Sequence, residues 1–500
     1  MGNRIKQLFR LKGVEENTSY KHMIDVDKYF KPDLKKARKR SQTEAEILSF
    51  EMDDRAKKIG IGKKYKIQTY GCQGNEADSE TMAGILENMG YVATQDESDA
   101  DIILLNTCAI RENAENRIWG ELGRLKPLKR RNPELLLGLC GCMAQEEKVV
   151  NRILEKYDQV DLVFGTHNLH KLQEYILFAY FNKERVIEVY SEEGNIVENL
   201  PKSRFNSYKA FVNIMFGCDE FCTYCIVPYT RGKERSRAKE DIIKEVNDLY
   251  NEGYHEVTLL GQNVNAYGKD RNNGEYTLGD LLVDLDKIGI PRIRFTTSHP
   301  HDLDQKTIDA FKNCKSVMPH LHLPVQSGSN SVLKKMNRHY TKEQYLEVIS
   351  RLKMAVPDIA LTTDIIVGFP TESNEDFLET IDLVKQVDFE GAYTFIFSKR
   401  AGTPAAKFED NISEQEKKNR LQALNKVVNE GYARASRKYA DKVVKVLVDG
   451  TSKADENTLA GYSEHNKLVN FKGDKSLIGK IVNVKITETR TWFLIGEACE

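Results

Sequence analysis

Long apolar runs and a large net charge are both missing from this chain of 500 residues. No stretch approaches the ~20 consecutive apolar residues that cross a membrane, and residues Met1 to Lys6 lack the apolar core of a secretory signal. Lys and Arg number 74 against 75 Asp and Glu, so no overall positive field attracts nucleic acid, and any RNA binding has to be local. We therefore expect a cytoplasmic protein with no membrane partner.

Cysteine is scarce as well. Nine cysteines in a chain of this length are too few for a disulfide scaffold. Their odd number favours metal ligands or catalytic thiols, and their spacing decides between these uses.

The pattern of apolar residues divides the chain into several domains. Residues 1–64 carry scattered charge and a basic run, Lys31–Arg40, and predict an N-terminal extension with short helices. Over residues 65–190, short apolar runs alternate with helix-length amphipathic segments, which indicates an open parallel α/β sheet with helices on both faces. The expected strands are Tyr65–Tyr70, Asp101–Asn106, Glu134–Gly141 and Leu162–Gly165.

A polar linker, Ser191–Ser207, precedes a second α/β region over residues 204–439. Six β/α units predict a partial or complete parallel barrel, whose working end lies where the strands end. The expected strands are Ala210–Phe216, Glu256–Gly261, Arg292–Ser298, His320–Val325, Ala360–Gly368 and Ala392–Phe397, followed by a long helix, Ser413–Tyr439.

The last region, residues 440–500, alternates apolar residues with glycine-containing turns, which predicts a small all-β barrel. Its expected strands are Lys442–Val448, Lys467–Phe471, Lys480–Glu488 and Trp492–Ile495.

Cys218, Cys222 and Cys225 form a C-x3-C-x2-C motif that follows Gly217 at the end of the first barrel strand. The spacing also suits one face of a helix, but Gly217 and the polar neighbours favour a loop. A structural zinc site requires four protein ligands, and no fourth is near. Three thiolates can instead hold three irons of a [4Fe-4S] cluster and leave one iron open to bind a substrate.

A second set, Cys72, Cys108 and Cys142, follows three expected strands of the first sheet. The ends of parallel strands share one crevice, so these thiols could converge on one cluster, although isolated buried thiols are the alternative. Cys140 could replace Cys142 as a ligand or fill the core. Cys314 and Cys499 match no ligand motif, and we interpret both as structural.

The segment Gly217-Cys-Asp-Glu-Phe-Cys-Thr-Tyr-Cys-Ile-Val-Pro-Tyr-Thr-Arg-Gly232 resembles the cluster loop of radical S-adenosylmethionine enzymes, specifically the methylthiotransferase family. The resemblance extends over roughly residues 65–500. It implies that the open iron binds S-adenosylmethionine. Reductive cleavage of that cofactor then yields a 5'-deoxyadenosyl radical, which abstracts hydrogen from the substrate.

Three more motifs, Thr69–Gln73, Asn106–Arg111 and Gly141–Gln145, resemble the ligand motifs of the family's N-terminal domain. They imply a second [4Fe-4S] cluster on Cys72, Cys108 and Cys142. Gly74 departs from the family's usual Cys-Gln-Met-Asn, which puts packing or substrate access beside Cys72 in question.

Two glycine-containing strand ends, Leu323–Ser329 and Ile366–Glu372, resemble the family's contacts to S-adenosylmethionine, although tight turns alone would also require glycine. No catalytic residue beyond the cluster ligands is expected. The implied cofactor contacts are Gln326, Ser327, Gly328, Gly368 and Pro370.

Two basic runs are expected to contact phosphates or to form solvated faces. The first comprises Arg231, Lys233, Arg235 and Arg237, and the second comprises Arg124, Lys126, Lys129, Arg130 and Arg131. The C-terminal barrel resembles the TRAM domain, an RNA-binding module. Its aromatic residues would pack its core or stack on bases, and they are Tyr462, Phe471, Trp492 and Phe493.

Within the family, Tyr224–Arg237 resembles the branch that acts on N6-dimethylallyladenosine at position 37 of tRNA. This implies addition of SCH3 at carbon 2 with two molecules of S-adenosylmethionine, an electron donor such as flavodoxin or ferredoxin, and a sulfur donor. The alternatives are the branches that modify threonylcarbamoyl-adenosine in tRNA or an aspartate of a ribosomal protein. A non-catalytic iron-sulfur RNA-binding protein is the alternative of a different class.

Overall fold

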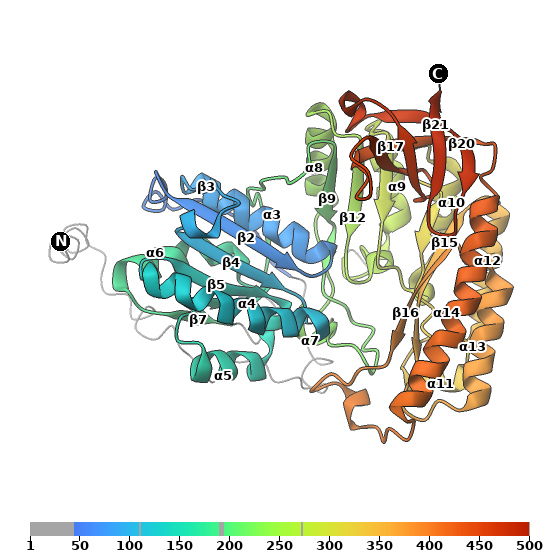
Figure 1. Cartoon of the computed structure of the whole chain (residues 1–500), viewed down its shortest axis with the longest axis horizontal. Coiled ribbons are helices and arrows are strands. Elements are labelled where there is room, and N and C mark those ends of the chain that lie inside the picture. Colours follow the sequence, from blue (N-terminus) through green and yellow to red (C-terminus); the bar gives the residue numbers. More distant parts are fainter. Residues whose placement is uncertain (1–44, 110–111, 190–194, 272–273, 500) are drawn as a thin grey trace. The chain divides into compact units, whose positions relative to one another are not determined.

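A computed structural model describes residues 45–109, 112–189, 195–271 and 274–499 (Figure 1). The basic run Lys31–Arg40, with most of the expected N-terminal extension, lies outside the described residues. The chain forms two compact units. Among the described residues, the first contains 51–70 and 85–189, and the second contains 45–50, 71–84 and 195–499.

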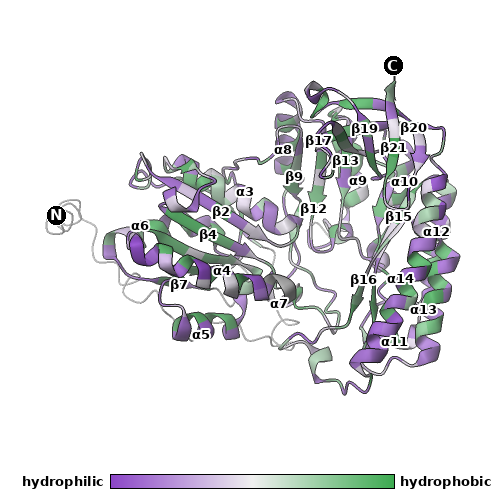
Figure 2. Ribbon diagram, in the orientation of Figure 1, coloured by the Kyte–Doolittle hydropathy of each residue, from purple (hydrophilic) through white to green (hydrophobic). Residues whose placement is uncertain are grey.

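The first unit is built on a six-stranded parallel sheet, which confirms the open α/β fold. Its two central strands are buried along their whole length, and Figure 2 shows β4 in the green of apolar residues. The sequence patterns missed the two edge strands, β3 and β7, which have two and three residues. In spatial order the strands are β3 (Val92–Ala93), β2 (Lys64–Tyr70), β4 (Ile102–Thr107), β5 (Leu136–Gly141), β6 (Leu162–Phe164) and β7 (Val186–Glu188).

Helices occupy the connections of this sheet. After β2 the chain forms α3 (Gln73–Asn88), and α4 (Glu112–Arg131), α5 (Glu147–Lys156) and α6 (Leu172–Asn182) follow in the same alternation.

The second unit contains the expected partial barrel. Strands β9 (Lys209–Asn213), β12 (Glu256–Leu260) and β13 (Arg292–Phe295) form one parallel sheet, and β14 (His320–His322), β15 (Ala360–Val367) and β16 (Gly391–Ile396) form another. A parallel bridge between Ile293 and Val317 links the two sheets. The six strands thus follow one another in chain order.

Helices lie between the barrel strands and after the last of them. They are α8 (Lys239–Asn251), α9 (Leu278–Asp286), α10 (Gln305–Asn313), α11 (Asn330–Lys335), α12 (Lys342–Ala355), α13 (Asn374–Val387) and the expected long helix α14 (Glu414–Arg437). None of the helices in the described part of the chain combines the length and the apolar character needed to cross a membrane.

The C-terminal region closes into a five-stranded barrel, as expected for its class. The sequence missed one strand, β18, whose Thr458-Leu-Ala-Gly-Tyr-Ser463 mixes small and polar residues. The strands are β17 (Val443–Thr451), β18 (Thr458–Ser463), β19 (Leu468–Lys472), β20 (Ile481–Thr489) and β21 (Leu494–Cys499).

Two buried arginines of β13 join this barrel to the parallel strands. Arg292 donates hydrogen bonds to the carbonyl oxygens of Lys445 and Tyr462, at 2.8 and 3.0 Å. Arg294 donates to those of Ser463 and Glu464, at 2.7 and 3.0 Å. Removal of the barrel would break all four of these hydrogen bonds.

Part of the expected polar linker forms a strand. Its residues Ile196–Glu198 form β8, which pairs in parallel with β1 (Ile47–Ser49), a strand in the region where only short helices were expected. Sequence patterns do not reveal such a pair because each strand has three residues and the partners are almost 150 positions apart.

The basic run that ends at Arg237 is not a solvated face. Arg231, Lys233, Arg235 and Arg237 are all at least nine-tenths buried, so the phosphate-binding interpretation of this run was wrong. Arg237 donates to both carboxylate oxygens of Glu198, at 2.7 and 2.6 Å, and to Glu245 of α8 at 2.8 Å. Burial alone would raise the pKa of Glu245, but the charges of Lys202, Arg237 and Arg204 hold it below its usual value.

Side chains of the second basic run, on α4, form ion pairs with acidic residues in the folded protein. Arg124 pairs with Glu97 and Glu121, both at 2.6 Å, Lys126 with Asp158 at 3.1 Å, and Lys129 with Asp161 at 2.9 Å. The Arg124 guanidinium lowers the pKa of Glu97 to about 2. Most of the expected positive patch is therefore neutralised by acids from other elements.

We expect Arg237→Ala to destabilise the protein by ~3 to 5 kcal/mol, because it leaves the Glu198 and Glu245 carboxylates buried without this cation. The matched control is Lys244→Ala. Lys244 pairs with Asp248 at 2.6 Å, but both side chains are at least half exposed, so its loss should cost at most about 0.5 kcal/mol. The shift of the urea unfolding midpoint measures both, and equal small shifts would contradict a role for the buried pair.

Candidate active site

The loop with Cys218, Cys222 and Cys225 is closed at its base by a two-stranded ribbon. β10 (Met215–Phe216) precedes the loop and pairs antiparallel with β11 (Arg235–Ser236), so the expected strand 210–216 divides into β9 and β10. Cys218 N also donates to Gly232 O at 3.1 Å. The motif is therefore in a loop and not on one face of a helix, and only Val227–Thr230 forms a short helix, α7, after it.

Gly217 is required at the start of the loop. Its φ of 77° is in the left-handed region, and a Cβ there would lie 1.8 Å from the carbonyl oxygen of Lys233. The Gly217 N–H donates to the side-chain oxygen of Gln262 at 2.5 Å. Gln262 lies two residues after the end of β12, so a side-chain amide from this strand end fixes the loop.

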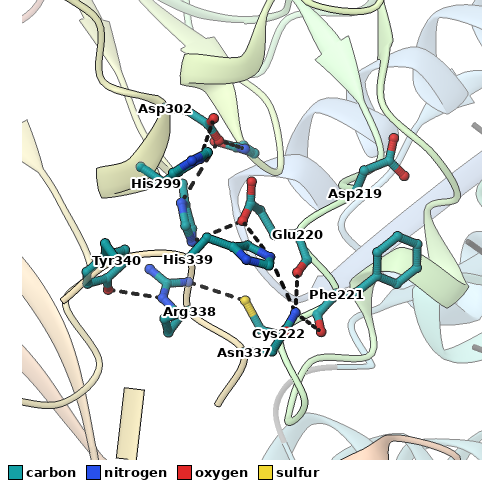
Figure 3. Close-up of polar contacts among 12 residues, drawn as sticks. Asp219, Glu220, Phe221, Cys222, His299, Asp302, Asn337, Arg338, His339 and Tyr340 are labelled. Carbon is teal, nitrogen blue, oxygen red and sulfur yellow. Dashed lines mark hydrogen bonds and ion pairs between the residues drawn. The ribbon is translucent and has the colours of Figure 1, made fainter. Parts of the chain in front are cut away.

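Two donors are directed at the sulfur atoms. The backbone N–H of Val227 donates to Cys225 Sγ at 3.4 Å, and Arg338 Nη1 donates to Cys222 Sγ at 3.3 Å. Figure 3 shows Arg338 between Cys222 and Tyr340, whose hydroxyl accepts from Arg338 Nε at 3.0 Å. Sequence reasoning missed Arg338, because it follows a helix of six residues and belongs to no motif.

The loop is also pinned along its length. Asn337 Nδ2 donates to the carbonyl oxygens of Glu220 and Phe221, both at 3.1 Å. Thr223 N donates to Met336 O, and Thr223 O accepts from Ala405 N, both at 2.9 Å. These contacts hold the non-glycine residue Phe221 at a φ of 46°.

The acid–base state of the thiols fits a metal cluster better than a free nucleophile. Burial raises the pKa of Cys218 well above its usual value, and Glu234 and the other two thiols add to the effect. Burial, and then Cys222, raise the pKa of Cys225 to about 12. Deprotonation of Cys218 and Cys225 therefore requires nearby positive charge, which bound iron supplies.

The second set of cysteines follows one register row of the six-stranded sheet. Tyr70, Thr107 and Gly141 are partners across β2, β4 and β5. Cys108 and Cys142 come directly after the second and third of these residues, and Cys72 comes two residues after the first.

The backbone around these cysteines is tightly packed. A Cβ on Gly141, whose φ is 92°, would lie 2.3 Å from Asn106 Oδ1. Cys108 and Cys142 are buried and Cys72 is partly exposed. Cys140, also buried, lies within β5 with its Sγ 3.6 Å from the carbonyl oxygen of Leu105.

Gly74, the departure from the family pattern, has space around it. A Cβ there would be in ordinary contact with Cys72 Sγ at 3.5 Å and with Arg231 Nη2 at 3.7 Å. Arg231 is paired with Asp78 at 2.6 Å. Glycine is thus not forced by the backbone, and it leaves Cys72 and Arg231 without a side chain between them.

The two glycine-containing strand ends are largely buried. Gly328 N donates to Thr380 Oγ1 at 2.9 Å, and a Cβ on Gly328 would collide with the backbone of α13. Gly368, with a φ of 69°, lies against the Lys417 side chain. Close packing on α13 and α14 therefore already explains both glycines.

Gln326 has a φ of 69° and bridges to β15, where its N–H donates to Asp364 O at 2.8 Å. The hydroxyl oxygen of Ser327 lies 3.3 Å from Thr380 Oγ1, within hydrogen-bonding distance. Pro370 is buried.

Comparisons with known proteins match this architecture. Residues 64–165 match the uncharacterized protein family UPF0004, residues 212–384 the Radical SAM superfamily, and residues 437–499 the TRAM domain. A tRNA-2-methylthio-N(6)-dimethylallyladenosine synthase from Oceanobacillus iheyensis is 58% identical over 493 residues, covering 97% of this chain and 95% of the relative. Proteins of the same name from Bacillus subtilis and Staphylococcus haemolyticus are 57% and 56% identical, covering 95% and 94% of this chain and 94% and 93% of theirs.

The barrel, its three-cysteine loop and these matches define a radical S-adenosylmethionine enzyme, a class that uses an iron-sulfur cluster and S-adenosylmethionine. More narrowly, the chain belongs to the family of tRNA-2-methylthio-N(6)-dimethylallyladenosine synthases.

We expect Gly217→Ala to abolish the iron-sulfur absorbance that depends on this loop, because the new methyl group would overlap the Lys233 carbonyl. The matched control is Gly253→Ala, where φ is 91° but no atom lies within 4 Å of the added Cβ. It shares the backbone cost of ~1 to 3 kcal/mol without the clash. The visible spectrum after anaerobic reconstitution measures both, and an unchanged spectrum for Gly217→Ala would contradict the requirement for glycine.

Proposed function

We propose that this enzyme replaces the hydrogen on carbon 2 of N6-dimethylallyladenosine, at position 37 of tRNA, with SCH3. The observation that carries this proposal is full-length identity of 56–58% to enzymes named for this reaction, together with a three-cysteine loop held in place by backbone and side-chain bonds. The TRAM match supports an RNA substrate. Action on tRNA also supports a cytoplasmic location.

Cys218, Cys222 and Cys225 would hold a [4Fe-4S] cluster. The N–H of Val227 and the guanidinium of Arg338 favour the charged sulfur atoms, and three ligands for four irons leave one iron open. When bound and reduced, such a cluster supplies the electron that cleaves the sulfonium of S-adenosylmethionine. The chain's own part is to fix the loop, which Gly217, Asn337 and the β10–β11 ribbon do.

Cys72, Cys108 and Cys142 would hold a second [4Fe-4S] cluster, which supplies or carries the sulfur. Their positions after three adjacent strands support this assignment, because the carboxyl ends of parallel strands lie along one edge of the sheet. An electron donor such as flavodoxin or ferredoxin and a donor that restores sulfur complete the cycle.

Contacts to S-adenosylmethionine would come from the ends of β14 and β15. The backbone there is fixed by bonds to α13 and β15, so its remaining polar groups have set directions. The residues assigned to this role are Gln326, Ser327, Gly328, Gly368 and Pro370.

Recognition of tRNA would use the exposed aromatic residues of the TRAM domain. Phe471 is buried in the core of that barrel, whereas Trp492 and Tyr462 are 59% and 39% exposed. Trp492 packs on Tyr432 of α14 with ring centroids 4.6 Å apart, which orients its ring.

Mass spectrometry of nucleosides tests the function. Reconstituted, reduced enzyme incubated with S-adenosylmethionine and tRNA that carries dimethylallyladenosine should yield the 2-methylthio product, and tRNA with threonylcarbamoyl-adenosine should not. Methylthiolation of the second tRNA alone would contradict the proposed substrate.

The two cysteine sets separate the two half-reactions. Each triple Cys→Ala variant should retain about four of roughly eight irons. Loss of Cys218, Cys222 and Cys225 should abolish cleavage of S-adenosylmethionine, whereas loss of Cys72, Cys108 and Cys142 should spare cleavage and abolish methylthiolation. Full iron content in either variant would contradict its ligand assignment.

Trp492→Ala should weaken tRNA binding about fivefold or more, since stacking on one base contributes ~1 to 3 kcal/mol. A point substitution is preferable to truncation because Arg292 and Arg294 depend on the barrel for partners. Tyr250→Ala, at an aromatic residue 41% exposed on α8, is the control. Both variants should still cleave S-adenosylmethionine. Equal tRNA affinities of the two variants would contradict a role of Trp492 in tRNA binding and leave it only a packing role.

A further inference from the structure

A second group of metal-binding side chains lies beside the cysteine loop. Glu220 stands within the loop, and His299, His301 and Asp302 come from the segment after β13, where Pro300–Asp302 forms a short 3-10 helix. One ligand atom from each of the four residues lies within 4.8 Å of all the others. None of them is a cysteine, so the group is chemically distinct from the proposed cluster ligands.

The central histidine of this group has no hydrogen bond to any residue that the structure describes. His299 is 5% exposed, and both of its ring nitrogens lack a partner within this described part of the chain. Its Nε2 lies 3.5 Å from Glu220 Oε2, and its Nδ1 lies 3.9 Å from Asp302 Oδ2. Figure 3 shows the ring between the two carboxylates. A buried imidazole without partners is costly, which points to a missing ligand.

One of the two carboxylates is also poorly compensated. Among the residues with described positions, none forms a hydrogen bond with the buried Glu220 Oε2, although this atom faces His299. Asp302 accepts from Asn263 Nδ2 at 2.6 Å and pairs with Lys269, which leaves Glu220 as the carboxylate with less compensation. His301 completes the group from the solvent side, with Nδ1 3.2 Å from Asp302 Oδ1.

We propose that Glu220, His299, His301 and Asp302 bind one divalent transition-metal ion. Two imidazoles and two carboxylates suit Zn²⁺, Fe²⁺ or Mn²⁺, whereas Mg²⁺ and Ca²⁺ prefer oxygen ligands alone. The ion would tie the cysteine loop, through Glu220, to the segment after β13. Its role is structural, and it goes beyond the proposed methylthiolation.

Mn²⁺ is the probe for this site. The reconstituted full-length enzyme is treated briefly with EDTA and gel-filtered, and its visible spectrum confirms that the clusters remain. Titration followed by the electron paramagnetic resonance signal of free Mn²⁺ should then reveal one tight site per chain, from which Zn²⁺ displaces Mn²⁺. Metal binding should also raise the midpoint of thermal unfolding.

His301→Ala is the principal variant, because this side chain is 51% exposed and lies on a different segment from the cysteines. It should weaken Mn²⁺ binding at least ~10-fold, and Glu220→Gln should do the same. The matched control is His339→Ala. His339 is 48% exposed and 3.8 Å from Glu220, but its Nε2 already contacts Asn337 Nδ2 at 3.4 Å.

Three results would overturn the proposal: no tight Mn²⁺ site in the wild type, unchanged binding in His301→Ala, or an equal loss in His339→Ala. Glu220→Gln counts only if its iron content matches the wild type, and His301→Ala keeps the test decisive if it does not.

Discussion

Two of the three thiols in one short, partly buried loop have a raised pKa, so they lose their protons only where positive charge lies beside them. Around Cys218, Cys222 and Cys225 this constraint accounts for most of what the neighbouring residues do. Arg338 and the Val227 N–H direct positive ends at sulfur, while Gly217, Gln262 and Asn337 keep the backbone in a conformation that brings the thiols together. The pKa values of Cys218 and Cys225 are raised, and bound iron would lower them because its positive charge favours the thiolate form.

The strands of the parallel barrel were predictable from sequence because their signals are local, whereas the two cysteine ligand sets stay predictions. An apolar run followed by glycine or cysteine marks a strand end whatever lies elsewhere in the chain. Arg338, by contrast, acts on Cys222 from 116 positions away. The β1–β8 pair likewise joins segments that are far apart in the sequence. Strand β18 was missed for another reason, because its small residues resemble a turn.

The basic runs in the sequence did not predict where positive charge is exposed on the folded protein. Arg237 belongs to a run of four basic residues, and it is buried between Glu198 and Glu245, which sequence does not place beside it. On α4, Arg124 and Lys129 meet acids 27 and 32 positions away. A protein whose opposite charges are nearly equal in number compensates its basic runs from distant segments, so such runs indicate nucleic-acid contacts only where they remain exposed.

The two arginines of β13 bind the C-terminal barrel through its backbone and not through its side chains. Arg292 and Arg294 donate hydrogen bonds to four backbone carbonyl oxygens of that barrel. Every amino acid has such an oxygen. The side chains at Lys445, Tyr462 and Glu464 are thus free to vary without loss of these bonds. During evolution the RNA-binding module can change its surface to follow its substrate, while the two arginines that hold it must stay as they are.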